Sequence, residues 1–149
     1  MRAGHAICGL ALGVGMSAAT AATAPPFGEL AGNWATPSGG VVEFGRCGKA
    51  SGEPSTCGRI AALGGSAGAE RLDKRNPSER LRARPVLGLE ILSGISPAGA
   101  GAWNVEALYN PDDGRTYRGA VRLLGDDRLE LKGCALAIFC QTQTWRRVR

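Results

Sequence analysis

The sequence predicts an all-β protein, built as an antiparallel up-and-down barrel of eight strands. Glycine is abundant, with 23 glycines among 149 residues, and turn-forming residues recur along the chain. Short runs in which apolar and polar residues alternate follow one another at regular spacing, as half-buried strands require. No long stretch shows the periodicity of an amphipathic helix. Because closure into a barrel removes exposed strand edges, we favour it over an open sandwich, which is the alternative.

The expected strands of the first half flank one long connection. The first two cover about residues 32–36 and 41–46, with a turn at 37–40, and the third covers 58–63. A polar connection over residues 64–84 follows, with one helical turn expected near 77–81. The fourth strand is expected over 86–95. Alternation there would place on one face Leu87, Leu89, Ile91, Ser93 and Ile95.

The second half continues as short hairpins. The fifth strand follows a turn at 97–101 and would carry on one face Trp103, Val105, Ala107 and Tyr109. The sixth covers 115–124, where Tyr117, Val121 and Leu123 alternate. After a turn at 125–127, the seventh strand contains Leu129 and Leu131, and the eighth covers 143–148. Short turns between successive strands favour the up-and-down order.

The N-terminal segment predicts export. Arg2 precedes an apolar run over about residues 6–16, and small residues then offer two A-x-A cleavage patterns. We expect residues 1–24 to be a signal peptide, cleaved after Ala21 or Ala24, and residues 25–149 to form one domain. A membrane anchor is disfavoured because crossing a bilayer takes roughly 20 apolar residues. The mature protein is expected in the periplasm or outside the cell, without integral membrane insertion.

Four cysteines follow the expected cleavage site, and an even number in an exported chain predicts disulfides. Cys47 ends the second expected strand and Cys57 opens the third, while Cys134 and Cys140 flank the last hairpin. We expect near neighbours to pair, as Cys47–Cys57 and Cys134–Cys140. Spacing alone also permits cross-pairing, such as Cys47 with Cys140.

Export would also remove His5, the only histidine. A mature chain without imidazole has no Ser-His-Asp or Cys-His nucleophile and no His-ligated metal. Glu90 and Glu106 are the candidate acid–base pair, but alternation turns Glu90 away from the apolar face. We therefore predict no enzymatic activity, no metal and no cofactor. A histidine-free hydrolase is the less favoured alternative.

Charge and local composition exclude some further partners. The net charge is +5, and the cations of residues 71–84 alternate with acidic residues and lack aromatic neighbours, so nucleic-acid binding is not expected. Residues 109–117, YNPDDGRTY, predict a tight turn, in which Pro111 presets the bend and Gly114 takes a positive φ. Asp112 and Asp113 are expected to cap backbone N–H groups. The ligand spacing of an EF-hand calcium loop is absent.

Five stretches in order resemble one known family: GNWATPSGGVVEF, CGRIAAL, NPSERLRARPVLGLEIL, AWNVEALYNPDDGRTYRGAVRL and LELKGCALAIFCQTQTWRRV. Over nearly all of the mature chain, the sequence resembles the exported bacterial family called domain of unknown function 2147. This resemblance implies a small lipocalin-like barrel without an established activity, and it supplies no catalytic residues.

The first expected strand has a second, smaller likeness. Gly32-x-Trp34 resembles the Gly-x-Trp of lipocalins, in which a basic residue of the last strand packs over the indole and closes the base of the barrel. Arg146 or Arg147 is expected to do this here. A desolvated guanidinium–indole pair contributes about 1–2 kcal/mol.

An eight-stranded barrel has room for packed side chains or for one small ligand at its mouth. The candidate ligand-binding residues lie on the connection and around the fifth and sixth strands. They are Asp73, Asn76, Arg80, Arg84, Trp103, Tyr109 and Tyr117. The three aromatic residues also alternate as core residues do, and Arg80 with Arg84 would suit a carboxylate or phosphate. We predict binding of a small polar or amphipathic molecule. The alternative is a cell-envelope module that contacts another protein.

Overall fold

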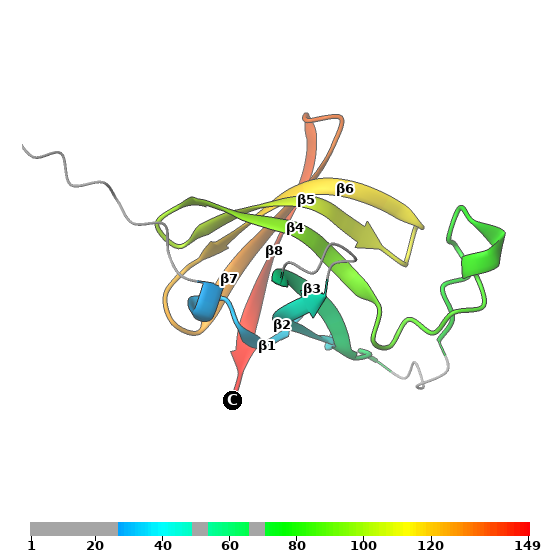
Figure 1. The fold of residues 1–149 in the computed structure, drawn as a ribbon, viewed down its shortest axis with the longest axis horizontal. Coiled ribbons are helices and arrows are strands. Elements are labelled where there is room, and N and C mark those ends of the chain that lie inside the picture. Colours follow the sequence, from blue (N-terminus) through cyan, green and yellow to red (C-terminus); the bar gives the residue numbers. More distant parts are fainter. Residues whose placement is uncertain (1–26, 49–53, 66–70) are drawn as a thin grey trace, which may run out of the picture.

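Each strand pairs antiparallel with the next one in sequence, and the last pairs back with the first, so that eight strands close into a barrel (Figure 1). The computed structural model describes residues 27–48, 54–65 and 71–149. The strands are β1 (Gly32–Ala35), β2 (Val41–Gly48), β3 (Pro54–Ala62), β4 (Glu90–Gly99), β5 (Ala102–Asn110), β6 (Arg115–Leu123), β7 (Arg128–Ala135) and β8 (Phe139–Val148). The predicted barrel is confirmed. The predicted signal peptide and His5 lie outside the described residues.

The described residues also form two short 3-10 helices. η1 (Phe27–Glu29) precedes β1, and η2 (Glu79–Leu81) lies in the long connection between β3 and β4, where one helical turn was expected. The connection folds back on itself through an isolated bridge between Leu72 and Pro85. In the described part of the chain, none of the helices has the length and apolar character needed to cross a membrane.

The face predicted for the fourth strand was wrong in part, although Ile91 packs against the core and Ile95 is buried as expected. β4 begins at Glu90, because the backbone of Val86 bonds to Arg71 in the connection instead of joining the sheet. Leu92 and Ile95, three residues apart, are the buried residues, whereas Leu87 is exposed. Gly94 between them has a φ of +62°, which interrupts simple alternation. Glycine adopts such a positive φ without the steric cost that a side chain would add.

β5 has a matching irregularity. Its register against β6 shifts between Val105 and Leu108, so Trp103 and Val105 are buried as predicted, and Leu108 then packs against the core. The Leu108 side chain lies over two glycines of the following strands, Gly119 on β6 and Gly133 on β7. A Cβ on Gly133 would lie only 2.8 Å from it. Beyond the shift, Tyr109 reaches the connection that follows β3.

The hydrophobic core fills one half of the barrel. Buried residues of that half include Trp34, Phe44, Trp103, Val121 and Leu129. The Trp145 ring, whose centre lies 6.4 Å from that of Phe44, belongs both to the core and to the cavity lining, so it lies where the packed region ends. The connections after β2, β4 and β6 lie at the packed end, which we call the base. Those after β1, β3, β5 and β7 lie at the other end, the mouth.

Arg147 closes the base. Its guanidinium lies over the Trp34 ring, 4.2 Å from the ring centre, and donates hydrogen bonds to the carbonyl oxygens of Glu29, Ala31 and Asp126. The Trp34 indole N–H in turn donates to the carbonyl of Leu30. Gly32 is part of the same arrangement, because a Cβ there would lie 3.3 Å from the Arg147 side chain. Arg146, the other candidate, is exposed.

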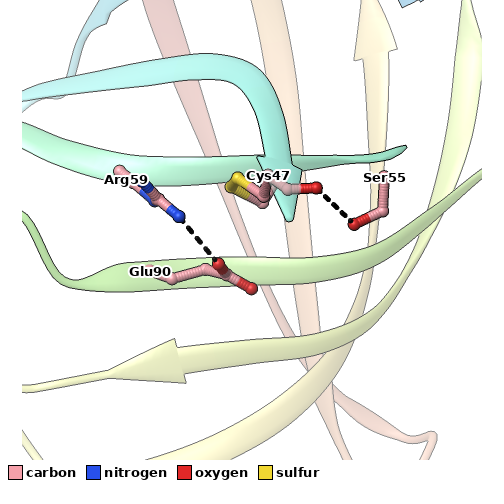
Figure 2. The surroundings of a disulfide bond; sticks show 5 residues. Cys47, Ser55, Arg59 and Glu90 are labelled. Atoms are coloured by element: carbon pink, nitrogen blue, oxygen red, sulfur yellow. Dashed lines mark hydrogen bonds and ion pairs between the residues drawn. A yellow bond between two sulfur atoms is a disulfide. The ribbon is translucent and has the colours of Figure 1, made fainter. Parts of the chain in front are cut away.

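Both expected disulfides form, Cys47–Cys57 between β2 and β3 and Cys134–Cys140 between β7 and β8. Figure 2 shows the first, with Ser55 donating a hydrogen bond to the carbonyl of Cys47. The bridged cysteines lie inside paired strands, which explains why β2, β3 and β8 extend further than alternation alone predicted. Each disulfide therefore joins two neighbouring strands of the barrel.

Candidate functional site

A cavity of about 560 Å³ opens at the mouth. Its inner wall is apolar and contains Val42, Ile60, Val86, Leu131 and Trp145. Its rim is polar and includes residues of the β5–β6 turn, the connection and the start of β8, namely Arg71, Asn110, Asp112, Asp113, Arg115, Gln141 and Gln143. This volume and this distribution of polarity suit one small molecule with an apolar body and a polar end.

The β5–β6 turn supplies one side of the rim. The backbone N–H of Arg115 donates to the Asp113 carboxylate at 2.9 Å, and the backbone N–H of Asp112 donates to the Asn110 side chain at 3.0 Å. The Tyr117 hydroxyl also donates to Asp113, and this hydrogen bond raises the pKa of Tyr117 above its ordinary value. Asp113 therefore caps a backbone N–H group as predicted, whereas Asp112 does not, because Asn110 is the other capping residue and the Asp112 carboxylate pairs with Arg71.

The turn and the connection lock together at Gly114. Gly114 is buried with a φ of +73°, and a Cβ built on it would lie 1.8 Å from the carbonyl oxygen of Arg75. An ion pair between Arg71 and Asp112 joins the same two segments at the surface. Figure 1 shows the connection, in green, beside the end of β5. The contact fixes one side of the rim to a segment far away in sequence.

Asp73 is the centre of a buried polar network under the connection. Its carboxylate has no exposed surface and accepts hydrogen bonds from the Tyr109 hydroxyl at 2.5 Å and the Asn76 amide at 2.9 Å. The Arg84 guanidinium donates to the same carboxylate at 2.9 and 2.8 Å and lies over the Tyr109 ring. The Asn76 amide also donates to Tyr109 at 3.0 Å. The four residues therefore supply hydrogen-bond partners to one another.

The network perturbs both of its acidic groups. Burial by itself would raise the pKa of Asp73, but the hydrogen bonds from Tyr109, Asn76 and Arg84 outweigh burial and hold the pKa below its ordinary value. Burial and the hydrogen bond to Asp73 together raise the pKa of Tyr109. At neutral pH the network therefore contains a carboxylate and a neutral phenol.

The structure separates the predicted ligand-binding residues into three groups. Tyr109 and Tyr117 line the cavity. Asp73, Asn76 and Arg84 come together, but their polar atoms are directed at one another and at Tyr109. Arg80 is exposed on η2, and Trp103 is fully buried in the core, so neither lines the cavity.

Several rim residues were not among the candidates from the sequence. Arg71, Asp112, Asp113 and Arg115 had been interpreted as parts of a loop or turn. A signal for them was present in the predicted topology, since alternate connections of an up-and-down barrel share one end. That rule places the β5–β6 turn, the long connection and the last hairpin around one opening.

The candidate carboxylate pair is not assembled. Glu90 forms an ion pair with Arg59 at 3.6 Å beside the Cys47–Cys57 disulfide, as Figure 2 shows, and both side chains are partly exposed. Glu106 is exposed on β5, next to Gly94. Among the described residues, the one group with metal-ligand spacing is Cys47, Cys57 and Glu90, and the disulfide occupies both of its sulfur atoms.

Residues 32–147, which include nearly all of the barrel, match the family described as uncharacterized protein conserved in bacteria, DUF2147. The chain belongs to this family. The DUF2147 chain is also similar in structure to protein HP1028 from Helicobacter pylori, a protein described as belonging to the lipocalin family. The TM-score is 0.64 at 25% identity, covering 80% of this chain and 83% of that chain. No curated protein matches. The DUF2147 domain here is thus a lipocalin-like barrel.

Proposed function

We propose that this DUF2147 protein binds a small amphipathic molecule non-covalently in its mouth. The observation that carries the proposal is the cavity itself, which has an apolar wall, a polar rim and a packed base. An apolar chain would lie against Val42, Ile60 and Leu131, and the polar end would stay at the rim. Each buried methylene group stabilises such a complex by about 0.8 kcal/mol, so a short chain is enough for measurable affinity.

Arg115 is the rim residue that we assign to the polar end of the ligand. Arg71 already pairs with Asp112, and Arg84 is held by Asp73. Among the described residues, Arg115 makes no ion pair with a carboxylate, and it lies near Tyr117 on the cavity wall. A guanidinium with free donors and a neighbouring phenol suit a carboxylate or phosphate head.

Binding is tested with a fluorescent polyene fatty acid as the probe. Ala135 lines the cavity, and Ala135→Trp should fill it and weaken binding by at least about 10-fold. Ala120→Trp, which adds the same bulk to β6 outside the cavity, should bind like the wild type. Arg115→Gln should weaken binding of the acid more than binding of the corresponding alcohol. Equal affinity of Ala135→Trp and the wild type would refute the proposed site.

We further propose that the protein is exported and holds its ligand without transforming it. Two disulfides are typical of proteins in oxidising compartments. The carboxylates that the sequence offered as an acid–base pair, Glu90 and Glu106, do not line the cavity, and Glu90 is paired with Arg59. The mass of the protein recovered from the cell envelope should correspond to cleavage after Ala21 or Ala24. Recovery of the uncleaved chain from the cytoplasm would contradict export.

A further inference from the structure

The tip of the β7–β8 hairpin is an exposed apolar surface. Leu136, Ile138 and Phe139 are 85%, 76% and 68% exposed, well above the other exposed large apolar residues of the described chain. In Figure 1 this hairpin, in orange and red, projects beyond the neighbouring strands. We call residues 136–139 the apolar tip. Isolated exposed apolar residues are ordinary on proteins, but three within four positions at a projecting end indicate an interaction site.

The apolar tip is built in a conformation that its own residues do not favour. Leu136 and Ala137 both have positive φ values, 52° and 61°, where glycine, asparagine and aspartate are the usual choices. The Cys134–Cys140 disulfide closes the hairpin directly below. Leu136 and Ile138 neither line the cavity nor belong to the core. Folding therefore gives no reason for apolar residues at these positions.

The outer face of the hairpin strands β7 and β8, together with the neighbouring β6, is basic. Outward positions alternate with the buried Val121, Leu129 and Trp145 and carry a set of exposed cations: Arg118, Arg122, Arg128, Lys132 and Arg146. The one carboxylate among the outward positions of these strands is Glu130. Arg118 pairs in register with Cys134, and Lys132 lies two residues before it, so both cations are close behind the apolar tip.

We propose that the apolar tip inserts into the surface of a bilayer that contains anionic lipids, with Arg118 and Lys132 contacting the headgroups. Lys132 lies four residues from Leu136, or about 13 Å at the rise of a β-strand. Amphipathic segments bury their apolar groups about 5–10 Å into the interface, which leaves the two cations at headgroup depth. Each cation near an anionic surface adds to binding.

The basic outer face favours an anionic bilayer over a second copy of the chain as the partner of the apolar tip. A second copy of the chain would bring two basic faces together, which opposes association. An anionic bilayer meets both features at once, since it accepts apolar side chains and attracts cations. Docking does not depend on the proposed ligand. It would, however, turn the mouth toward the bilayer, because Phe139 belongs to the apolar tip and also lines the cavity.

The test is co-sedimentation of the mature protein with vesicles of phosphatidylethanolamine and phosphatidylglycerol, and with vesicles of phosphatidylcholine alone. Leu136→Ser combined with Ile138→Ser removes two of the three large apolar side chains of the apolar tip without altering the cavity lining, and should weaken binding at least about 10-fold. The matched control is Leu81→Ser with Leu87→Ser, which removes two exposed leucines of the connection and should leave binding unchanged.

The charge requirement is tested in the same assay. Arg118→Gln with Lys132→Gln should weaken binding roughly 10-fold or more, and added salt should weaken the wild type similarly. Arg122→Gln with Arg146→Gln removes two cations near the base and should have a smaller effect. Ile138→Trp places a fluorophore in the apolar tip, and its emission should shift to the blue when phosphatidylglycerol vesicles are added.

Three results would overturn the proposal. The first is no sedimentation of the wild type with anionic vesicles at low salt. The second is binding that the Leu136→Ser, Ile138→Ser variant retains. The third is a dimer in solution that this variant converts to a monomer, which would assign the apolar tip to self-association. Because the variant keeps the cavity lining, fatty-acid binding by the same protein reports separately on the proposed function.

Discussion

Arg147 and Trp34 hold the last strand of the barrel against the first, through a guanidinium that stacks on the indole at 4.2 Å. The two residues pair in register where β8 meets β1. Three backbone carbonyls, from η1, the segment before β1 and the β6–β7 turn, accept hydrogen bonds from the same guanidinium. One side chain thus joins four segments at the base.

Removing the Arg147 side chain should destabilise the protein strongly. Arg147→Ala loses the stacking and leaves three carbonyls without their donor, at a cost of about 3 kcal/mol. Arg146→Ala, one position earlier and exposed, should cost less than about 0.5 kcal/mol. Urea unfolding of the two variants measures the difference. Similar losses in both would mean that Arg147 does not close the base.

Gly114→Ala should be more damaging than its backbone angle alone predicts. The new Cβ would lie 1.8 Å from the Arg75 carbonyl oxygen, so the β5–β6 turn and the connection would have to separate. Gly88→Ala is the matched control, because Gly88 has a φ of +80° and a Cβ added there would meet no atom within 4 Å. The control should cost about 1 kcal/mol and Gly114→Ala at least about 2 kcal/mol more. Thermal unfolding compares the two, and equal costs would show that the contact is not needed.

Asp73→Asn should destabilise the protein at neutral pH by about 3 kcal/mol, because it removes the charge that Arg84 neutralises inside the network. The pKa of Asp73 is lowered from 3.8, so ionised Asp73 stabilises the folded protein fully at pH values above 3.8. That stabilisation is lost as the pH falls through the lower pKa of the folded state. The difference between wild type and Asp73→Asn, followed by urea unfolding against pH, should therefore shrink in acid. A difference that stays constant down to the acid end would contradict the lowered pKa.

Tyr109→Phe should change the alkaline side of the same profile. The pKa of Tyr109 is raised from 10.0 in the folded protein, so the stabilisation from the neutral phenol is complete below pH 10.0 and is lost as the pH rises through the folded-state pKa. Tyr109→Phe lacks this loss, although it starts from a lower stability because Asp73 loses a donor. Because the pKa of Tyr117 is raised as well, ultraviolet titration of the wild type compared with Tyr109→Phe isolates the Tyr109 phenolate and checks its raised pKa. A wild-type tyrosine titration with no late component would contradict it.

Removing one disulfide tests the hairpin at the mouth. Replacing Cys134 and Cys140 with alanine opens a short loop, and the chain-entropy model predicts a loss of about 2 kcal/mol. The Cys47–Cys57 bridge should remain intact and the barrel folded. Hydrogen exchange should increase in residues 134–140 and stay unchanged around β1. Unfolding of the whole barrel would show that this bridge does more than fix the hairpin.

The sequence predicted the barrel well because its strands are marked by alternation and by short turns. The exceptions are β4 and β5, where Gly94 and the shift near Val105 change which residues face inward. Such irregularities depend on cross-strand packing, as with Leu108 over Gly133, and one strand read alone does not contain that information. The Cys134–Cys140 pairing was predictable because the two cysteines flank one hairpin.

The candidate site was predicted less completely. Asp73, Arg84 and Tyr109 were predicted to be ligand-binding residues, but a single sequence does not reveal that their polar groups would bond to one another across two segments. The rim depends on the meeting of the β5–β6 turn with the connection at Gly114, a contact between residues distant in sequence. The apolar tip was visible as LAIF between two cysteines, yet its exposure required the hairpin to project beyond the barrel.

The packed base has a consequence for the exchange of a bound ligand. Because Arg147 and Trp34 close the base, a ligand that enters through the mouth would have to leave through the mouth. Ligand uptake and ligand release would then use the same opening, so anything that covers the mouth would slow both.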